Sequence, residues 1–315
     1  MSRLSGSVLA SLDAQVLCVA SLPHSGRVVN ASDDGYVTMW ESKTMIWRKD
    51  HADVTTVAVS PAGTQVVCGT LHGDLQLRDA DSGVSHSDPL RLHNDRVWSV
   101  CWSPDVERIA SCSADDTFII WKPSTGEVIH RSLQTGHGVV RAIAYCPKGG
   151  SRVVTSGHDS TIRIWDDTTG VLQVTLPIQT EAVLSSESTI PSVSWTTDGN
   201  KIISGSVDGN VRMWDVLQRK MLWEVPAHDD AIHHIAVSEH VFATTSADNT
   251  IKLWNLETHC LVGLSSFIDD HDEARCIALT ADENSLVAGT KNGKIYTFDI
   301  GDIVSGMKTV SPRII

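Results

Sequence analysis

The segment Thr161-Ile162-Arg163-Ile164-Trp165-Asp166 is one copy of a motif that recurs along the whole chain. Each copy is a short run, rich in β-branched residues, that ends in an aromatic residue and is usually followed by an acid. Four more copies end in Trp, and two degenerate copies end in Arg78 and Phe298. The seven closing positions are 40, 78, 121, 165, 214, 254 and 298, and they lie 38 to 49 residues apart. This spacing is close to the period of about 40–45 residues that a four-stranded propeller blade needs.

The third copy indicates how one repeat folds. Val97–Ser103 and Arg108–Cys112 are strand-like runs, Asp115-Asp116 turns the chain into Thr117–Trp121, and Glu127–His130 supplies a fourth strand. Such a sheet cannot bury two apolar faces alone, but seven sheets packed radially can. We therefore expect an all-β fold, a seven-bladed β-propeller of four-stranded antiparallel blades that forms a single domain over residues 1–315.

Closing the ring requires strand exchange between the N- and C-terminal segments. Ser5–Leu9 resembles the fourth-strand pattern of the third copy, which favours an N-terminal strand on the outside of the last blade. The tail offers an alternative, with Gly306–Val310 as that strand.

Composition limits the possible partners. The chain has 315 residues, 41% of them hydrophobic, and a formal net charge of −13, which weighs against nonspecific binding to nucleic acid or to an anionic membrane. No stretch of 18 apolar residues predicts a membrane span. The seven cysteines are scattered and form no C-x-x-C pair, so we expect reduced thiols in the cytoplasm, the nucleus or both.

These repeats resemble the WD-repeat β-propeller family over essentially the full length. The resemblance implies a hydrogen-bonded structural set in each blade: a His before the first strand, a hydroxyl on the second, an Asp in the next turn and the closing Trp, whose indole N–H is expected to hold the hydroxyl. The set is complete three times, at His93, Ser111, Asp115 and Trp121; at His137, Thr155, Asp159 and Trp165; and at His228, Thr244, Asp248 and Trp254. It is least complete in the blade ending at Arg78, which keeps His51, and in the last blade, which keeps His271. We expect these two blades to be the least stable, because buried hydrogen bonds contribute about 0.5–1.5 kcal/mol each.

The same residue types could suggest chemistry. Ser111, His93 and Asp115 have the composition of a hydrolase triad, but a nucleophile must face its substrate, and repetition of the set in blade after blade indicates scaffolding. His233 and His234 are adjacent on a strand and are expected to point to opposite faces, which disfavours one shared metal. The sequence holds no phosphate-loop, dinucleotide or H-E-x-x-H motif. We expect no catalytic, cofactor or metal site.

In the family, the loops that enter the first strands and the turns between second and third strands share one face, the top. The resemblance implies that one residue near the start of each first strand lines the top rim: Leu17, Thr56, Trp98, Arg141, Pro191, His233 and Arg275. The turns add Leu71, His158 and Lys291. The segment 179–189 is an extension on the same face, interpreted as a polar loop or as partial cover for the channel mouth.

The hypothesis is a non-enzymatic scaffold or adaptor, a monomeric propeller within a larger complex. Its rim would suit a partner protein or peptide with acidic groups and an apolar anchor, because Trp and Arg are enriched where interface energy concentrates. The alternative is an enzyme or small-molecule binder that uses the mouth of the central channel. Such a site would need convergent acids or bases, and the rim residues include no carboxylate pair.

Overall fold

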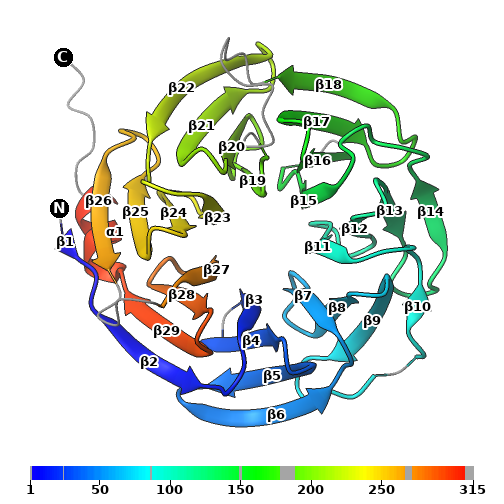
Figure 1. Cartoon of the computed structure of the whole chain (residues 1–315), viewed down its shortest axis with the longest axis horizontal. Coiled ribbons are helices and arrows are strands. Elements are labelled where there is room, and N and C mark those ends of the chain that lie inside the picture. Colours follow the sequence, from blue (N-terminus) through cyan, green and yellow to red (C-terminus); the bar gives the residue numbers. More distant parts are fainter. Residues whose placement is uncertain are drawn as a thin grey trace.

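The architecture is a closed ring of seven small sheets, as the repeat predicts (Figure 1). The computed structural model describes residues 2–23, 25–85, 87–148, 151–177, 189–266 and 272–308. Within these residues every sheet has at least four strands, and the first strand of each blade lies innermost. The expected fold class is confirmed.

The first four blades follow the chain in order. Blade 1 contains β3 (Val16–Ser21), β4 (Arg27–Ser32), β5 (Tyr36–Glu41) and β6 (Thr44–Asp50). Blade 2 contains β7 (Val54–Val59), β8 (Gln65–Thr70), β9 (Asp74–Asp79) and β10 (Leu90–Arg91). Blade 3 contains β11 (Val97–Trp102), β12 (Ile109–Ser113), β13 (Phe118–Trp121) and β14 (Val128–Arg131). Blade 4 contains β15 (Val140–Tyr145), β16 (Arg152–Gly157), β17 (Thr161–Asp166) and β18 (Leu172–Pro177).

The last three blades include the chain's N-terminal strands. Blade 5 contains β19 (Ser192–Trp195), β20 (Lys201–Gly205), β21 (Asn210–Asp215) and β22 (Lys220–Pro226). Blade 6 contains β23 (Ile232–Val237), β24 (Val241–Ser246), β25 (Thr250–Asn255), β26 (Leu261–Ser266) and, at its outer edge, β1 (Ser2–Arg3). Blade 7 contains β27 (Ala274–Leu279), β28 (Ser285–Thr290), β29 (Lys294–Asp299) and, as its outer strand, β2 (Gly6–Ser11).

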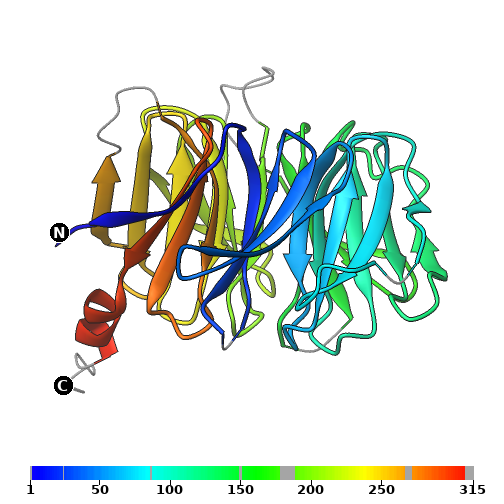
Figure 2. The same cartoon turned by 90° about the horizontal axis from the view of Figure 1, so that it is seen from below.

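The N-terminal segment closes the ring. β2 pairs antiparallel with β29, from Gly6 opposite Phe298 to Ser11 opposite Lys294, which confirms the N-terminal alternative. The tail instead forms helix α1 (Gly301–Lys308), which lies at the outer edge of the ring, level with the lower ends of the blades in Figure 2. The alternative strand at 306–310 is therefore wrong for residues 306–308, which are helical. Thr309 and Val310 lie outside the described residues.

The core lies between the blades. The described buried apolar residues form seven clusters, each of which joins two consecutive blades. Between blades 3 and 4, for example, the rings of Phe118 and Trp165 lie 5.2 Å apart, beside Ile143. Burying a side chain of this size contributes about 1.5–3 kcal/mol. Each blade therefore depends on both neighbours for its apolar contacts.

Tight turns between second and third strands depend on left-handed backbone. The residue after the turn Asp has a positive φ in blades 3, 4 and 6, at Asp116, Ser160 and Asn249. Blade 5 places Gly209 there, at φ +79°, where a Cβ would lie 2.3 Å from the carbonyl oxygen of His228. Only glycine fits that position without a shift of the backbone.

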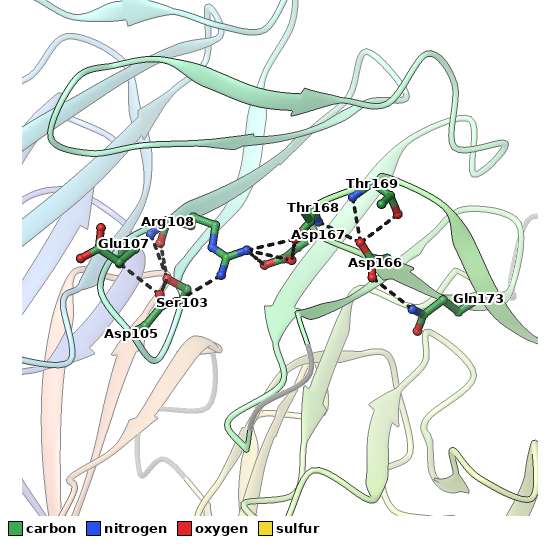
Figure 3. A network of polar contacts seen from close by, with 9 residues as sticks. All are labelled: Ser103, Asp105, Glu107, Arg108, Asp166, Asp167, Thr168, Thr169 and Gln173. Atoms are coloured by element: carbon green, nitrogen blue, oxygen red, sulfur yellow. Dashed lines mark hydrogen bonds and ion pairs between the residues drawn. The ribbon is translucent and has the colours of Figure 1, made fainter.

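The bottom face, opposite the turns just described, carries a charged link between blades 3 and 4 (Figure 3). Arg108 follows the β11–β12 turn, and its Nη1 lies 2.9 Å from the carboxylate of Asp167, in the turn after β17. Asp167 is 1% exposed, and Arg108 also pairs with Asp105 at 3.1 Å. The neighbouring Asp166 accepts hydrogen bonds from the backbone of Thr168 and Thr169 and from the side chain of Gln173. The two blades are thus joined by polar contacts as well as by their core.

In the part of the chain that the structure describes, no helix is both long and apolar enough to cross a bilayer.

Candidate partner-binding face

Blade 4 shows the hydrogen-bonded set that the family resemblance implies. Trp165 Nε1–H donates to Thr155 Oγ1 at 2.8 Å, and that hydroxyl donates to His137 Nε2 at 3.0 Å. His137 Nδ1–H then donates to Asp159 at 2.6 Å. Blade 6 repeats the arrangement with Trp254, Thr244, His228 and Asp248, at 3.1, 2.7 and 2.9 Å.

Blade 3 departs from this pattern at its Trp. Ser111 and His93 Nε2 are 2.9 Å apart, and His93 Nδ1 lies 3.3 Å from Asp115. The expected bond from Trp121 to Ser111 is wrong, because Trp121 Nε1 is buried and has no hydrogen-bond partner in the described part of the chain.

The set has no exposed nucleophile. Ser111, Thr155 and Thr244 are each 0% exposed. Burial opposes ionisation of Asp159, but hydrogen bonds and charge from His137, together with Arg163, lower its pKa to about 2. The carboxylate is therefore a fixed negative charge that orients a buried His, which is a structural arrangement.

Blade 5 lacks the His, and an arginine takes over its bond to the turn. Arg212, in β21, is 1% exposed and reaches Asp208 at 2.6 Å and Glu224 at 2.6 Å. Trp214 still donates to Ser204 at 2.9 Å. The sequence carries a signal for this pair, since Asp208 and Arg212 have the same four-residue spacing as Asp159 and Arg163.

Blade 2 replaces the closing Trp by a buried arginine that forms new bonds. Arg78 donates to the carbonyl oxygens of Asp50 at 2.9 Å and Gly83 at 3.0 Å, and lies 3.1 Å from His51 Nδ1. Burial, followed by the Arg78 charge, lowers the pKa of His51 to about 4. Blade 2 has therefore exchanged its hydrogen bonds rather than simply lost them. His271, the corresponding residue of blade 7, lies outside the described residues.

The turns and entry loops do lie together on the top face. In every blade the residue before the turn position donates its backbone N–H to the loop that enters the first strand. The seven pairs, donor first, are Asp33 and Gln15, Leu71 and Asp53, Ala114 and Arg96, His158 and Val139, Val207 and Thr189, Ala247 and Ala231, and Lys291 and Glu273, at 2.8 to 3.3 Å.

The structure brings most of the rim residues together around one central cavity. Its volume is about 370 Å³. The residues expected from the seven first strands all line it: Leu17, Thr56, Trp98, Arg141, Pro191, His233 and Arg275. Leu71, His158 and Lys291 lie on the surrounding turns and are absent from the lining. Sequence reasoning missed Arg96, which also lines the cavity and stands two residues before Trp98.

On the side of blades 6 and 7, the cations share one carboxylate. Glu273 pairs with Arg275 at 3.2 Å and with Lys291 at 3.7 Å, and it also contacts His233 Nε2. Burial is the main cause that lowers the pKa of His233, and the Glu273 hydrogen bond opposes it. One carboxylate is thus shared by two permanent cations, so the positive charge on this side is neutralised in part.

On the side of blades 3 and 4, two arginines share one aromatic ring. The guanidinium carbon of Arg96 lies 3.9 Å from the centroid of the Trp98 ring, and that of Arg141 lies 3.6 Å from it. Burial, and then the charge of Arg96, lowers the pKa of Arg141 to about 10. Arg141 is still a cation at neutral pH, and it lies within cation–π distance of the indole.

The side chains of the two adjacent histidines both contact blade 7, so the expectation of opposite faces is wrong. A register shift in β23 between Ile232 and His234 disturbs the normal alternation. His233 pairs with Glu273, whereas His234 Nδ1 lies 3.0 Å from the carbonyl oxygen of Ile277. Among the described residues, no group of three or more His, Cys, Asp or Glu side chains is placed to hold a metal ion.

The extension at 179–189 lies outside the described residues except for Thr189, whose carbonyl oxygen accepts a hydrogen bond from Val207.

The sequence matches a family model described as "WD domain, G-beta repeat" at residues 6–41, 86–122, 129–166, 179–215 and 219–255. The closing positions of the two degenerate copies, Arg78 and Phe298, fall outside these matches. Among curated proteins, the "Guanine nucleotide-binding protein subunit beta" of Solanum tuberosum is 27% identical over 304 residues, covering 88% of this chain and 78% of the relative. The protein of the same name from Arabidopsis thaliana is 28% identical, with the same coverage. Since the matched repeats span more than half of the residues and the structure closes into seven blades, the chain belongs to the WD40 repeat family.

Proposed function

We propose that this propeller is a non-enzymatic scaffold or adaptor subunit that binds a partner protein or peptide on its top face. The observation that carries the proposal is the central cavity, whose lining includes Trp98 and three arginines. Aromatic and Arg side chains are the types enriched at the energetic centres of protein interfaces. The curated relatives are named as subunits, which supports work within a larger complex.

The proposal includes an intracellular setting and excludes nucleic acid and membrane surfaces as the main partners. All seven cysteines are free, and burial raises the pKa of the partly buried Cys101 thiol to about 12, as suits a reduced thiol. The net charge of −13 would repel phosphate backbones and anionic headgroups over most of the surface.

The alternative use of the cavity, by an enzyme or a small-molecule binder, is less well supported. A volume of about 370 Å³ falls within the range of ligand pockets. However, the described residues that line the cavity include no Asp or Glu, so these residues offer no carboxylate for general acid or base catalysis.

Affinity purification combined with chemical cross-linking tests the proposal. The wild type is compared with a Trp98→Ala/Arg141→Ala variant and with an Arg131→Ala control, which removes an exposed arginine from the outer strand of blade 3. We expect a partner that the control retains and the double variant loses, with cross-links to Lys291 on the top turn. Identical partners for all three folded proteins, or cross-links confined to Lys122 below blade 3, would refute top-face binding.

A further inference from the structure

The central cavity is positively charged on a protein that is strongly negative overall. Three arginines, Arg96, Arg141 and Arg275, carry this charge. His233 and His234 also line the cavity, but burial lowers the pKa of each, so the charge comes from the arginines. Among the residues that the structure describes, no Asp or Glu lines it. Such a concentration of one sign of charge within a concave site raises the local concentration of ligands of the opposite sign.

Only part of this charge is compensated from within. Arg275 pairs with Glu273 at 3.2 Å. Arg96 and Arg141 have no ion pair within 4 Å among the described residues. The carboxylate nearest in sequence, that of Asp95, accepts the backbone N–H of Arg96 at 2.7 Å instead of pairing with its side chain.

The two uncompensated guanidinium groups are held in place before any ligand arrives. Both lie within 4 Å of the centroid of the Trp98 ring, although Arg96 precedes β11 in blade 3 and Arg141 lies in β15 of blade 4. Burial lowers the pKa of Arg96, and burial followed by the Arg96 charge lowers the pKa of Arg141 to about 10, so the two cations lie near enough to repel each other. Burial, and then the charge of Arg141, lowers the pKa of His158, so this turn residue lies near the same positive charge.

A bound anion would relieve this repulsion, and the two arginine side chains would not first have to become ordered. A guanidinium group donates two parallel hydrogen bonds to a carboxylate or a phosphoryl group, and an indole face leaves the guanidinium edge available for them. The cations around Glu273 already share a carboxylate, so a bound anion would gain less free energy there.

We propose that Arg96 and Arg141, held against Trp98, form a subsite that binds one anionic group of the partner, a carboxylate or a phosphoryl group on a peptide. This inference rests on the proposed function and names the chemistry that the top face recognises.

The test uses the full chain and four pools of immobilised decapeptides, degenerate except at one central position. That position is Glu, phosphoserine, Gln or Ser. The proteins are wild type, Arg96→Gln, Arg141→Gln and Arg131→Gln, the last being a matched control with the same change in charge on an exposed residue. Circular dichroism melts check that each variant is folded.

The wild type and Arg131→Gln should retain the Glu or phosphoserine pool at least tenfold better than its neutral counterpart, Gln or Ser. Arg96→Gln and Arg141→Gln should reduce that preference to less than threefold. The stronger of the two acidic pools identifies the source of the anion. If Arg141→Gln does not fold, Arg141→Lys keeps the charge but loses the fork of donors, and it should show a preference between those of Arg96→Gln and the wild type.

Equal retention of acidic and neutral pools by the wild type, including no retention of either, would overturn the subsite. So would a preference that survives in both folded Gln variants. Failure of the subsite alone can be told apart from failure of the proposed function. If neutral peptides bind the wild type but not Trp98→Ala, the proposal of top-face binding stands and only the anion subsite is rejected.

Discussion

Arg141 of blade 4 lies over the indole of Trp98 of blade 3, with its guanidinium carbon 3.6 Å from the ring centroid. The contact joins these two neighbouring blades at the top face. At the bottom face the same blades are joined by the ion pair between Arg108 and Asp167. The top contact therefore has two roles, one in holding the blades together and one in presenting a cation to the cavity.

A double-mutant cycle should detect this contact as a coupling in stability. Trp98→Leu, Arg141→Gln and the double variant are compared by urea unfolding. We expect a coupling free energy of about 0.5–2 kcal/mol, the range for a cation over an aromatic ring in partly desolvated surroundings. Additive effects of the two single changes would mean that the stack contributes nothing to the folded state.

The closing tryptophans should respond differently to loss of the indole N–H. Trp165→Phe removes the hydrogen bond to Thr155 and leaves that hydroxyl without its donor. Trp121→Phe removes no hydrogen bond, because Trp121 Nε1 has no partner in the described structure. The free energy of unfolding should fall by about 1 kcal/mol more for Trp165→Phe than for Trp121→Phe. Equal losses in chemical denaturation would show that the difference between blades 3 and 4 has no energetic consequence.

Blade 2 should make stability depend on pH between about 6.5 and 4. Burial and Arg78 depress the pKa of folded His51 to about 4 from its ordinary value of 6.5, so below pH 6.5 the unfolded chain binds a proton that the folded chain does not. This contribution is complete above pH 6.5 and is lost as the pH falls towards 4, by up to about 1.4 kcal/mol per pH unit. The measurement is the free energy of unfolding of the wild type and His51→Asn at several pH values.

The control for that measurement is His72→Asn, which changes an exposed histidine in the same blade. In the control, the free energy of unfolding should depend on pH as in the wild type. In His51→Asn this dependence should be flatter. A wild-type slope in His51→Asn would assign the pH dependence to other groups.

Closure of the ring should depend on one side chain between the two N-terminal strands. Leu4 is 4% exposed and packs in the cluster that joins blades 6 and 7, and its backbone N–H donates to Leu264 at 2.9 Å. Leu4→Ala should cost about 2–4 kcal/mol through lost burial and the cavity left behind. Val8→Ala, on the exposed side of β2 in the same segment, should cost under about 1 kcal/mol. Similar melting temperatures for the two variants would show that the N-terminal segment is not a structural closure.

Features that repeat could be predicted from the sequence, because each blade provides an independent copy of the signal. The seven sheets follow from positions that recur, and the outer strand from the N-terminus is one of two alternatives that the pattern allows. The ring of first-strand residues around the cavity is what the family resemblance implies for one such position. The first-strand position carries Leu17 in one blade and Arg141 in another, yet both line the cavity, since backbone register places them.

Features confined to one blade could not be predicted in this way. The bonds of Arg78 to backbone carbonyls and the missing bond of Trp121 depend on how individual side chains pack, and no repeat reports that packing. The β1 pairing involves only two residues, too few for a pattern. Arg96 was missed because it precedes its strand, and only the structure shows it against Trp98.

The measurement that tests the account most directly is the dissociation constant of a purified partner that cross-links to the top face, determined for the wild type, Trp98→Ala/Arg141→Ala and Arg131→Ala. The account predicts binding at least tenfold weaker for the folded double variant, which corresponds to about 1.4 kcal/mol or more, and no change for Arg131→Ala. A dissociation constant for the double variant equal to that of the wild type, with the fold intact, would contradict it.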